Sequence, residues 1–134
     1  MFEFLKYSIF TLFHGTSGFL ITFLLSESGF LEVSVPVMAS AFLFSMLPDL
    51  DILTARTVRD HHRSLFHAPG FWIVISSIVS IFNSVLGVRL LLHTFFHLFN
   101  DYLCARTTGV FFFYPFRENE YSLFQIKSRK EISQ

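Results

Sequence analysis

Four apolar segments dominate the chain and limit the folds that it can adopt. They cover residues 4–25, 31–47, 71–88 and 90–103 of 134. A membrane-spanning helix needs ~17–25 apolar residues, so the first segment is long enough, the next two are near the lower limit and the last is below it. The chain is 52% hydrophobic, with 20 phenylalanines, and soluble domains are roughly 45–50% apolar. We therefore predict an all-α protein, an integral membrane bundle of about four transmembrane or membrane-embedded helices.

The breaks between these segments predict how the helices are connected. Residues 26–29 end the first segment, and Pro36 suits the first turn of a second helix, so the two are expected to form an antiparallel hairpin. Pro48 closes the second helix, and Pro69 with the glycine after it opens the third. Residues 83–87 form a weaker break, which leaves open either two helices or one continuous bent helix.

The placement of charge predicts the topology, although ten basic and ten acidic residues balance. If the four segments cross in turn, both termini and the loop of residues 48–69 share one side. That side holds most of the basic residues: Lys6, Arg56, Arg59, Arg63, Arg106, Arg117, Lys127, Arg129 and Lys130. The other side holds Arg89 with the acidic Glu27 and Glu32. By the positive-inside rule we expect a multi-pass protein of the inner (plasma) membrane with cytoplasmic termini and no cleaved signal peptide.

The composition changes once along the chain and gives a simple domain division. Residues 1–116 are expected to form one membrane-embedded helical domain, and residues 117–134 a polar cytoplasmic tail. The aromatic residues of the stretch 110–116 are typical of a segment at the membrane interface.

The predicted hairpins bring distant histidines and aspartates to one level. A turn centred near Phe30 places His14 about 5 Å along the axis from Asp49, and a turn at Ser84 places His67 level with Asp101. Imidazole and carboxylate groups together bind metals such as zinc. We therefore predict a binuclear or larger metal site at the cytoplasmic end, with these ligands: His14, Asp49, Asp51, His62, His67, His97 and Asp101.

Each of these residues also has a simpler interpretation when it is taken alone. His97 and Asp101 lie one helical turn apart and can hold a cation or form a buried hydrogen bond. Asp49 and Asp51 can mark a helix end at the membrane boundary, and His14 can be a packed core residue. The loop histidines can be solvent-exposed. The convergence of all seven residues at one level is what favours a site.

The order of the motifs resembles the YdjM-like (DUF457) family of membrane-bound metal-dependent hydrolases. The resemblance runs from His14 through L-P-D-L-D (47–51), H-R-x-x-x-H (62–67) and H-x-x-x-D (97–101) to Tyr-Pro-Phe, which ends at Phe116. It implies that the same seven residues bind metal. The ligand types are also distantly similar to those of zinc-dependent phospholipase C and P1 nuclease.

The loop departs from the family pattern. Ser64, Phe66 and Ala68 stand where the family has Gly, Thr and Ser, so we expect hydroxyl support near His67 to be missing. His61 falls outside the family spacing and is expected to face solvent.

The resemblance and the residue types imply a hydrolase that uses two or three divalent ions, with zinc expected. The expected substrate is a phosphoester, a phospholipid or a lipid-linked phosphate, met among membrane lipids at the cytoplasmic surface. Asp51 would accept a proton and Arg63 would hold the phosphate. The alternatives are a metal or proton carrier and a non-enzymatic membrane adaptor with structural histidines. No nucleic-acid partner is predicted, and the oligomeric state stays open.

Overall fold

The structure is a computed structural model that describes residues 2–53, 55, 61–104, 109–117, 119 and 121–123. Its elements are helical, and in chain order they are α1 (Phe2–Glu27), α2 (Val35–Met46), η1 (Leu47–Leu53), η2 (Leu65–His67), α4 (Pro69–Phe82) and α5 (Ser84–Cys104). In the described part of the chain, pairing between extended segments is limited to one isolated bridge, Val110 with Tyr121. The all-α prediction is confirmed.

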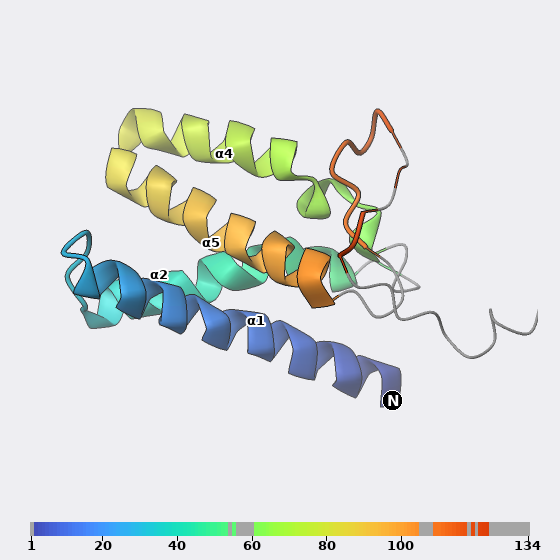
Figure 1. Cartoon of the computed structure of the whole chain (residues 1–134), viewed down its shortest axis with the longest axis horizontal. Coiled ribbons are helices and arrows are strands. Elements are labelled where there is room, and N and C mark those ends of the chain that lie inside the picture. Colours follow the sequence, from blue (N-terminus) through green and yellow to red (C-terminus); the bar gives the residue numbers. More distant parts are fainter. Residues whose placement is uncertain are drawn as a thin grey trace, which may run out of the picture.

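The four long helices form two antiparallel hairpins that share α5 as their common contact (Figure 1). Helix α1 packs on α2, α4 packs on α5, and α5 also contacts both α1 and α2. The α1–α2 and α4–α5 turns lie at the same end of the bundle. The start of α1, the two short helices and the end of α5 lie at the other end, which we call the loop end (Figure 1).

Local signals in the sequence set the first turn. Gly29 has φ +75°, a left-handed conformation that favours glycine, and it follows the end of α1. Ser34 then caps α2, because its hydroxyl accepts a hydrogen bond from the Val37 N–H, and Pro36 lies in the first turn. The predicted hairpin is therefore confirmed, with its turn between Glu27 and Val35.

Asn83 separates α4 from α5 and decides between the two alternatives for this region. Its backbone is extended, with φ −153° and ψ 101°, and its N–H bonds the Val79 carbonyl at the end of α4. Its side-chain oxygen accepts a hydrogen bond of 2.9 Å from the Leu86 N–H in the first turn of α5. One residue thus ends one helix and caps the next, and the chain has two helices rather than one bent helix.

Close packing along the two hairpins involves small residues and an aromatic core. Gly18 of α1 faces the Ala41 carbonyl of α2, and Gly87 of α5 faces the Ser76 carbonyl of α4. A hydrophobic cluster of Trp72, Leu90 and Leu98 joins α4 to α5, and Phe44 and Leu47 from the α2 side pack against it. These contacts fix how far the helices are shifted along the bundle axis relative to one another, and therefore which polar residues of different helices meet.

The segment after α5 folds back over the loop end. Val110 and Phe111 are buried, and Val110 pairs with Tyr121 through two main-chain hydrogen bonds. Val110 and Phe111 are therefore packed inside the protein and are not exposed as membrane anchors, whereas Phe113 and Phe116 are exposed, and the interfacial position of the stretch stays a prediction. Most of the predicted tail, 117–134, lies outside the described residues.

Large apolar side chains cover much of the outside of the bundle. Ile81 and Phe82 are 79% and 86% exposed. By length and composition, one helical stretch of the described chain, Val35–Leu53, can cross a membrane, and Pro69–Phe82 is a shorter apolar helix. A bundle of four helices is thus established, while the number of membrane spans stays a prediction.

Alanine at Gly18 or Gly87 is expected to destabilise the fold by about 1–3 kcal/mol through overpacking. The added Cβ would lie 2.7 Å from the Ala41 oxygen and 2.6 Å from the Ser76 oxygen. Thermal unfolding in detergent, followed by circular dichroism, measures the effect. Gly70→Ala is the matched control, since no atom lies within 4 Å of its added Cβ and alanine favours helix. Equal unfolding temperatures for all three variants would contradict the close-packing explanation.

Candidate metal centre

Among the residues that the structure describes, eight histidines and aspartates meet at the loop end of the bundle, and we call them the His/Asp cluster. His14 comes from α1, Asp49 and Asp51 from η1, and His97 and Asp101 from α5, while the remaining three lie on the segment that leads into α4. The cluster consists of His14, Asp49, Asp51, His61, His62, His67, His97 and Asp101. All seven residues predicted from the sequence are therefore brought together.

The α5 residues join the cluster to α1. Asp101 Oδ2 lies 3.1 Å from His97 Nε2, and Asp101 Oδ1 lies 3.2 Å from His14 Nε2. The two imidazole centroids are 4.0 Å apart. His97 Nδ1 donates a 2.7 Å hydrogen bond to the Ser45 carbonyl, and a carbonyl can only accept. Nδ1 therefore carries a proton, and Nε2 is the His97 atom that faces the inside of the cluster and can bind a ligand there when it is unprotonated.

Asp49 lies between the α5 residues and the loop histidines. Its Oδ1 atom is 3.4 Å from His97 Nε2, 3.2 Å from His61 Nε2 and 3.8 Å from His67 Nε2. Asp49 is 5% exposed, and a buried carboxylate needs compensating partners. The Asp49 carboxylate therefore contacts both the α5 histidine and the histidines of the loop.

His61 is buried, and the prediction that it faces solvent is wrong. It is 5% exposed, and its Nδ1 lies 2.5 Å from Asp51 Oδ1 while its Nε2 faces Asp49. Burial lowers its pKa, but hydrogen bonds to the two carboxylates outweigh burial and raise the pKa to about 9. The physical reason for the error is that two buried carboxylates attract an imidazole whatever the family spacing. In metal-free protein the protonated ring balances part of the negative charge of the cluster, and its Nε2 atom can bind a metal ion only after losing its proton.

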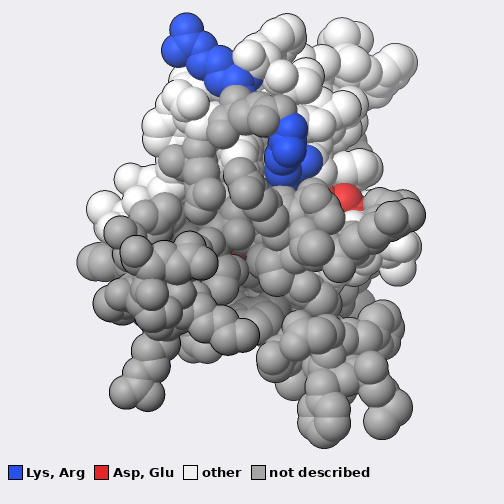
Figure 2. All heavy atoms as spheres, turned by 90° about the vertical axis from the view of Figure 1, so that its right-hand side faces the viewer, with Lys and Arg blue, Asp and Glu red and all other residues white. Residues whose placement is uncertain are grey.

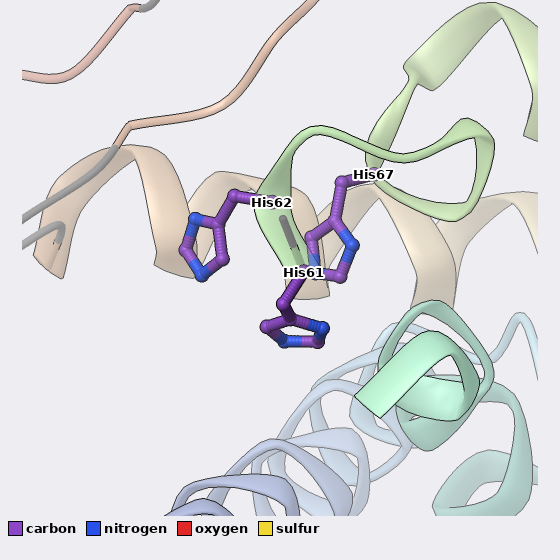
Figure 3. A group of neighbouring side chains, drawn as sticks. All are labelled: His61, His62 and His67. Atoms are coloured by element: carbon purple, nitrogen blue, oxygen red, sulfur yellow. The ribbon is translucent and has the colours of Figure 1, made fainter. Parts of the chain in front are cut away.

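The three loop histidines gather at one place (Figure 3). The His62 and His67 rings stack with centroids 5.0 Å apart and an interplanar angle of 8°, and the His61 centroid is 4.4 Å from that of His67. Burial lowers the pKa of His62 to about 4 and also lowers the pKa of His67. Both rings are therefore neutral at neutral pH, the state in which imidazole binds metal.

Ser64 supplies a hydroxyl near His67, where the departures from the family pattern predicted that none would be present. Its Oγ–H donates to Asp51 Oδ2, and its Oγ lies 3.5 Å from His67 Nδ1. The expectation of missing hydroxyl support near His67 is therefore wrong, because a serine three residues before the histidine reaches the same ring. Phe66 stabilises the loop differently, since its carbonyl accepts a 2.6 Å hydrogen bond from Trp72 Nε1.

The arrangement of donor atoms fits bound metal ions. Three sets of donors have their ligand atoms within 4.8 Å of one another: His61, His62 and His67; His14, His97 and Asp101; and Asp49, His67 and His97. Six buried polar atoms of the cluster form no hydrogen bond, although His97 Nε2 and Asp101 Oδ2 lie 3.1 Å apart as an ion pair: His14 Nδ1, Asp49 Oδ2, His62 Nδ1, His67 Nε2, His97 Nε2 and Asp101 Oδ2. Orphaned buried donors and acceptors are rare in native proteins. A mixture of imidazole nitrogen and carboxylate oxygen donors suits zinc and similar divalent ions.

Arg63 occupies a different position from the cluster. It follows His62 directly and is exposed, and Figure 2 shows basic side chains on the surface of this end. Arg63, which was predicted to hold the phosphate, therefore lies outside the buried part of the site.

The molecule therefore belongs to the class of all-helical proteins that carry a buried His/Asp cluster at one end of an apolar bundle. The sequence model of the YdjM inner membrane protein family matches residues 10–132. The chain therefore belongs to that family, and an inner-membrane location follows. No curated protein and no solved structure matches the chain, so the likeness to phospholipase C and P1 nuclease stays an expectation.

His61→Ala is expected to weaken zinc binding by about 10- to 100-fold, because the change removes a donor and a partner of both η1 carboxylates. Competition with a chromophoric chelator measures the dissociation constant. Leu65→Ala, an exposed position on the same loop, is the control and should bind as the wild type does. Unchanged affinity in His61→Ala would show that His61 does not contribute to zinc binding.

Proposed function

We propose that the protein is a membrane-bound metal-dependent hydrolase that acts on a phosphoester at the cytoplasmic surface of the inner membrane. One observation supports this most directly: the six orphaned polar atoms of the His/Asp cluster. A stable fold leaves few such atoms buried, and divalent cations bound by these residues would give partners to donor atoms among them.

Two zinc ions fit the grouping of the donors. His14, His97 and Asp101 would hold one ion, and His61, His62 and His67 the other, with Asp49 between them. Bound zinc supplies a water of lowered pKa and polarises a phosphoryl oxygen. The chain itself contributes a buried, water-poor site, in which charge interactions are stronger than in bulk water.

Arg63 is proposed to bind the substrate phosphate. Its guanidinium is exposed on the loop that carries three histidines, and guanidinium groups bind phosphate through paired hydrogen bonds. A substrate could therefore contact Arg63 at the surface while its reacting bond reaches the cluster.

The proposed substrate is a phospholipid or lipid-linked phosphate because of the surfaces that surround the site. Exposed apolar side chains on α1, α2 and α4 face outward, among them Phe23, Leu43 and Ile78, and would lie against lipid. The cluster at the loop end would then lie at headgroup depth. Four membrane-embedded helices with cytoplasmic termini complete the proposed topology.

A metal or proton carrier is the second candidate, and buried polar groups away from the cluster favour it. His93 is fully buried and lies 3.4 Å from the Thr22 hydroxyl. Arg89, one turn earlier on α5, donates to the Val37 carbonyl and to Ser40. These residues extend polar character along α5 from the cluster towards the opposite end, as an ion path requires.

His97→Ala and Asp101→Ala are expected to lose bound zinc and to reduce phosphoester hydrolysis by more than about 100-fold. Each change removes a donor from the set that includes His14. Plasma emission spectrometry of protein purified in detergent measures the metal. Assays with bis(p-nitrophenyl) phosphate and with phosphatidylglycerol in mixed micelles measure hydrolysis.

His93→Gln is the control for this pair, since His93 lies on the same helix outside the ligand sets. It should keep both metal and hydrolysis. Metal-free wild-type protein, or unchanged metal in both ligand variants, would refute the proposal. Metal binding without hydrolysis, combined with ion flux into vesicles that His93→Gln abolishes, would favour the carrier.

Reporter fusions test the proposed topology. Alkaline phosphatase inserted after Val33, in the α1–α2 turn, is expected to be active because that turn would face the periplasm. The same enzyme inserted after Leu123 is expected to be inactive, and green fluorescent protein there should fluoresce. Activity at both positions, or the reverse pattern, would contradict the orientation predicted from the basic residues.

A further inference from the structure

Asp51 differs from the other two carboxylates of the cluster in what its oxygens contact. Asp51 Oδ1 lies 2.5 Å from His61 Nδ1, and Asp51 Oδ2 lies 3.3 Å from His67 Nδ1 and accepts the Ser64 hydroxyl. Asp49 Oδ2 and Asp101 Oδ2 form no hydrogen bond, and Asp101 Oδ2 instead faces His97 Nε2 at 3.1 Å. Asp51 is also absent from all three donor sets found among the described residues.

The contacts of Asp51 determine which nitrogen of each ring faces the cluster. A carboxylate accepts hydrogen bonds, so the Nδ1 atoms of His61 and His67 carry the protons that point to Asp51. The Nε2 atoms then face the opposite way. Both Nε2 atoms lie near the same oxygen, Asp49 Oδ1, at 3.2 Å for His61 and 3.8 Å for His67, and His67 Nε2 also lies 3.6 Å from Asp101 Oδ2.

We infer that Asp51 is a positioning residue that orients His61 and His67, rather than the metal ligand and proton acceptor expected from the sequence. One carboxylate holds two imidazoles by their Nδ1–H groups and directs both Nε2 atoms to the same ion. Metal-bound histidines commonly donate their second N–H to a carboxylate or carbonyl, which fixes the ring and increases its basicity. The inference rests on the proposed metal site.

Ser64 extends this arrangement by one residue. Its hydroxyl donates to the Asp51 oxygen that also faces His67, so it fixes the rotation of the carboxylate about its last bond. The chain Ser64, Asp51, His67 therefore runs from the half-buried loop into the buried cluster.

The test uses the full chain in detergent, with Co²⁺ as a spectroscopic probe and Zn²⁺ for affinity. Asp51→Asn is expected to bind the full complement of metal at saturation, with Co²⁺ absorption bands at wild-type positions. Its Zn²⁺ affinity should fall about 10- to 100-fold. Asp49→Asn is the matched control, and it should lose stoichiometry and shift the bands because it replaces a carboxylate donor with a neutral, weakly binding amide.

Two serine variants test the extension. Ser64→Ala should weaken Zn²⁺ binding in the same direction as Asp51→Asn but less, and Ser64→Thr should restore it because the hydroxyl returns. In metal-free protein, ¹⁵N shifts of the His67 ring should report a protonated Nδ1 in the wild type, and this signature should change in Asp51→Asn. A purely structural role would alter stability without moving the ring shifts.

The outcomes separate this inference from the proposed function. Wild-type protein that binds no Co²⁺ or Zn²⁺ would refute the metal site itself. If the wild type binds metal but Asp51→Asn loses stoichiometry or shifts the Co²⁺ bands as Asp49→Asn does, Asp51 is a ligand and the inference is wrong. A wild-type His67 ring protonated at Nε2 instead of Nδ1 would also overturn it.

Discussion

Burial of charge beside an apolar bundle is the constraint on which the rest of this structure depends. The His/Asp cluster brings three carboxylates and five imidazoles of the described chain to one end of the molecule, and most of them are less than a tenth exposed. An unpaired buried carboxylate is costly, so each one must be matched by groups from other elements. The positions of α1, η1, the histidine loop and α5 are therefore linked, since moving any one of them leaves charge uncompensated in the other three.

The sequence predicted the convergence of these residues but not all of their contacts. Antiparallel hairpins of equal rise place His14 near Asp49 and His67 near Asp101 without knowledge of any side chain. His67 and Asp101 lie 3.6 Å apart, and His14 contacts Asp101 directly. Regular helices transmit position along the chain predictably, and for that reason the helix-borne part of the site could be predicted.

The irregular loop was harder to predict because its side-chain directions depend on tertiary partners. Nothing in the local sequence distinguishes His61 from His62, and only the location of Asp49 and Asp51 shows that His61 faces inward. Ser64 is a similar case, since its importance comes from the Asp51 oxygen that it contacts. Closeness in sequence to two predicted buried acids favours an inward position for His61 and His62 alike, and does not separate them.

Asn83 has a consequence at the far end of the molecule. As the single non-helical residue between α4 and α5, it leaves no slack by which the two helices could slide past each other. Helix α4 has 14 residues and is therefore about 21 Å long. Because α4 is a rigid helix, the position of the turn along the bundle axis also sets the position of the loop that holds His67. The one-residue connection between α4 and α5 thus helps to determine where the histidine loop lies at the opposite end of the bundle, and with it the positions of the candidate metal-binding side chains.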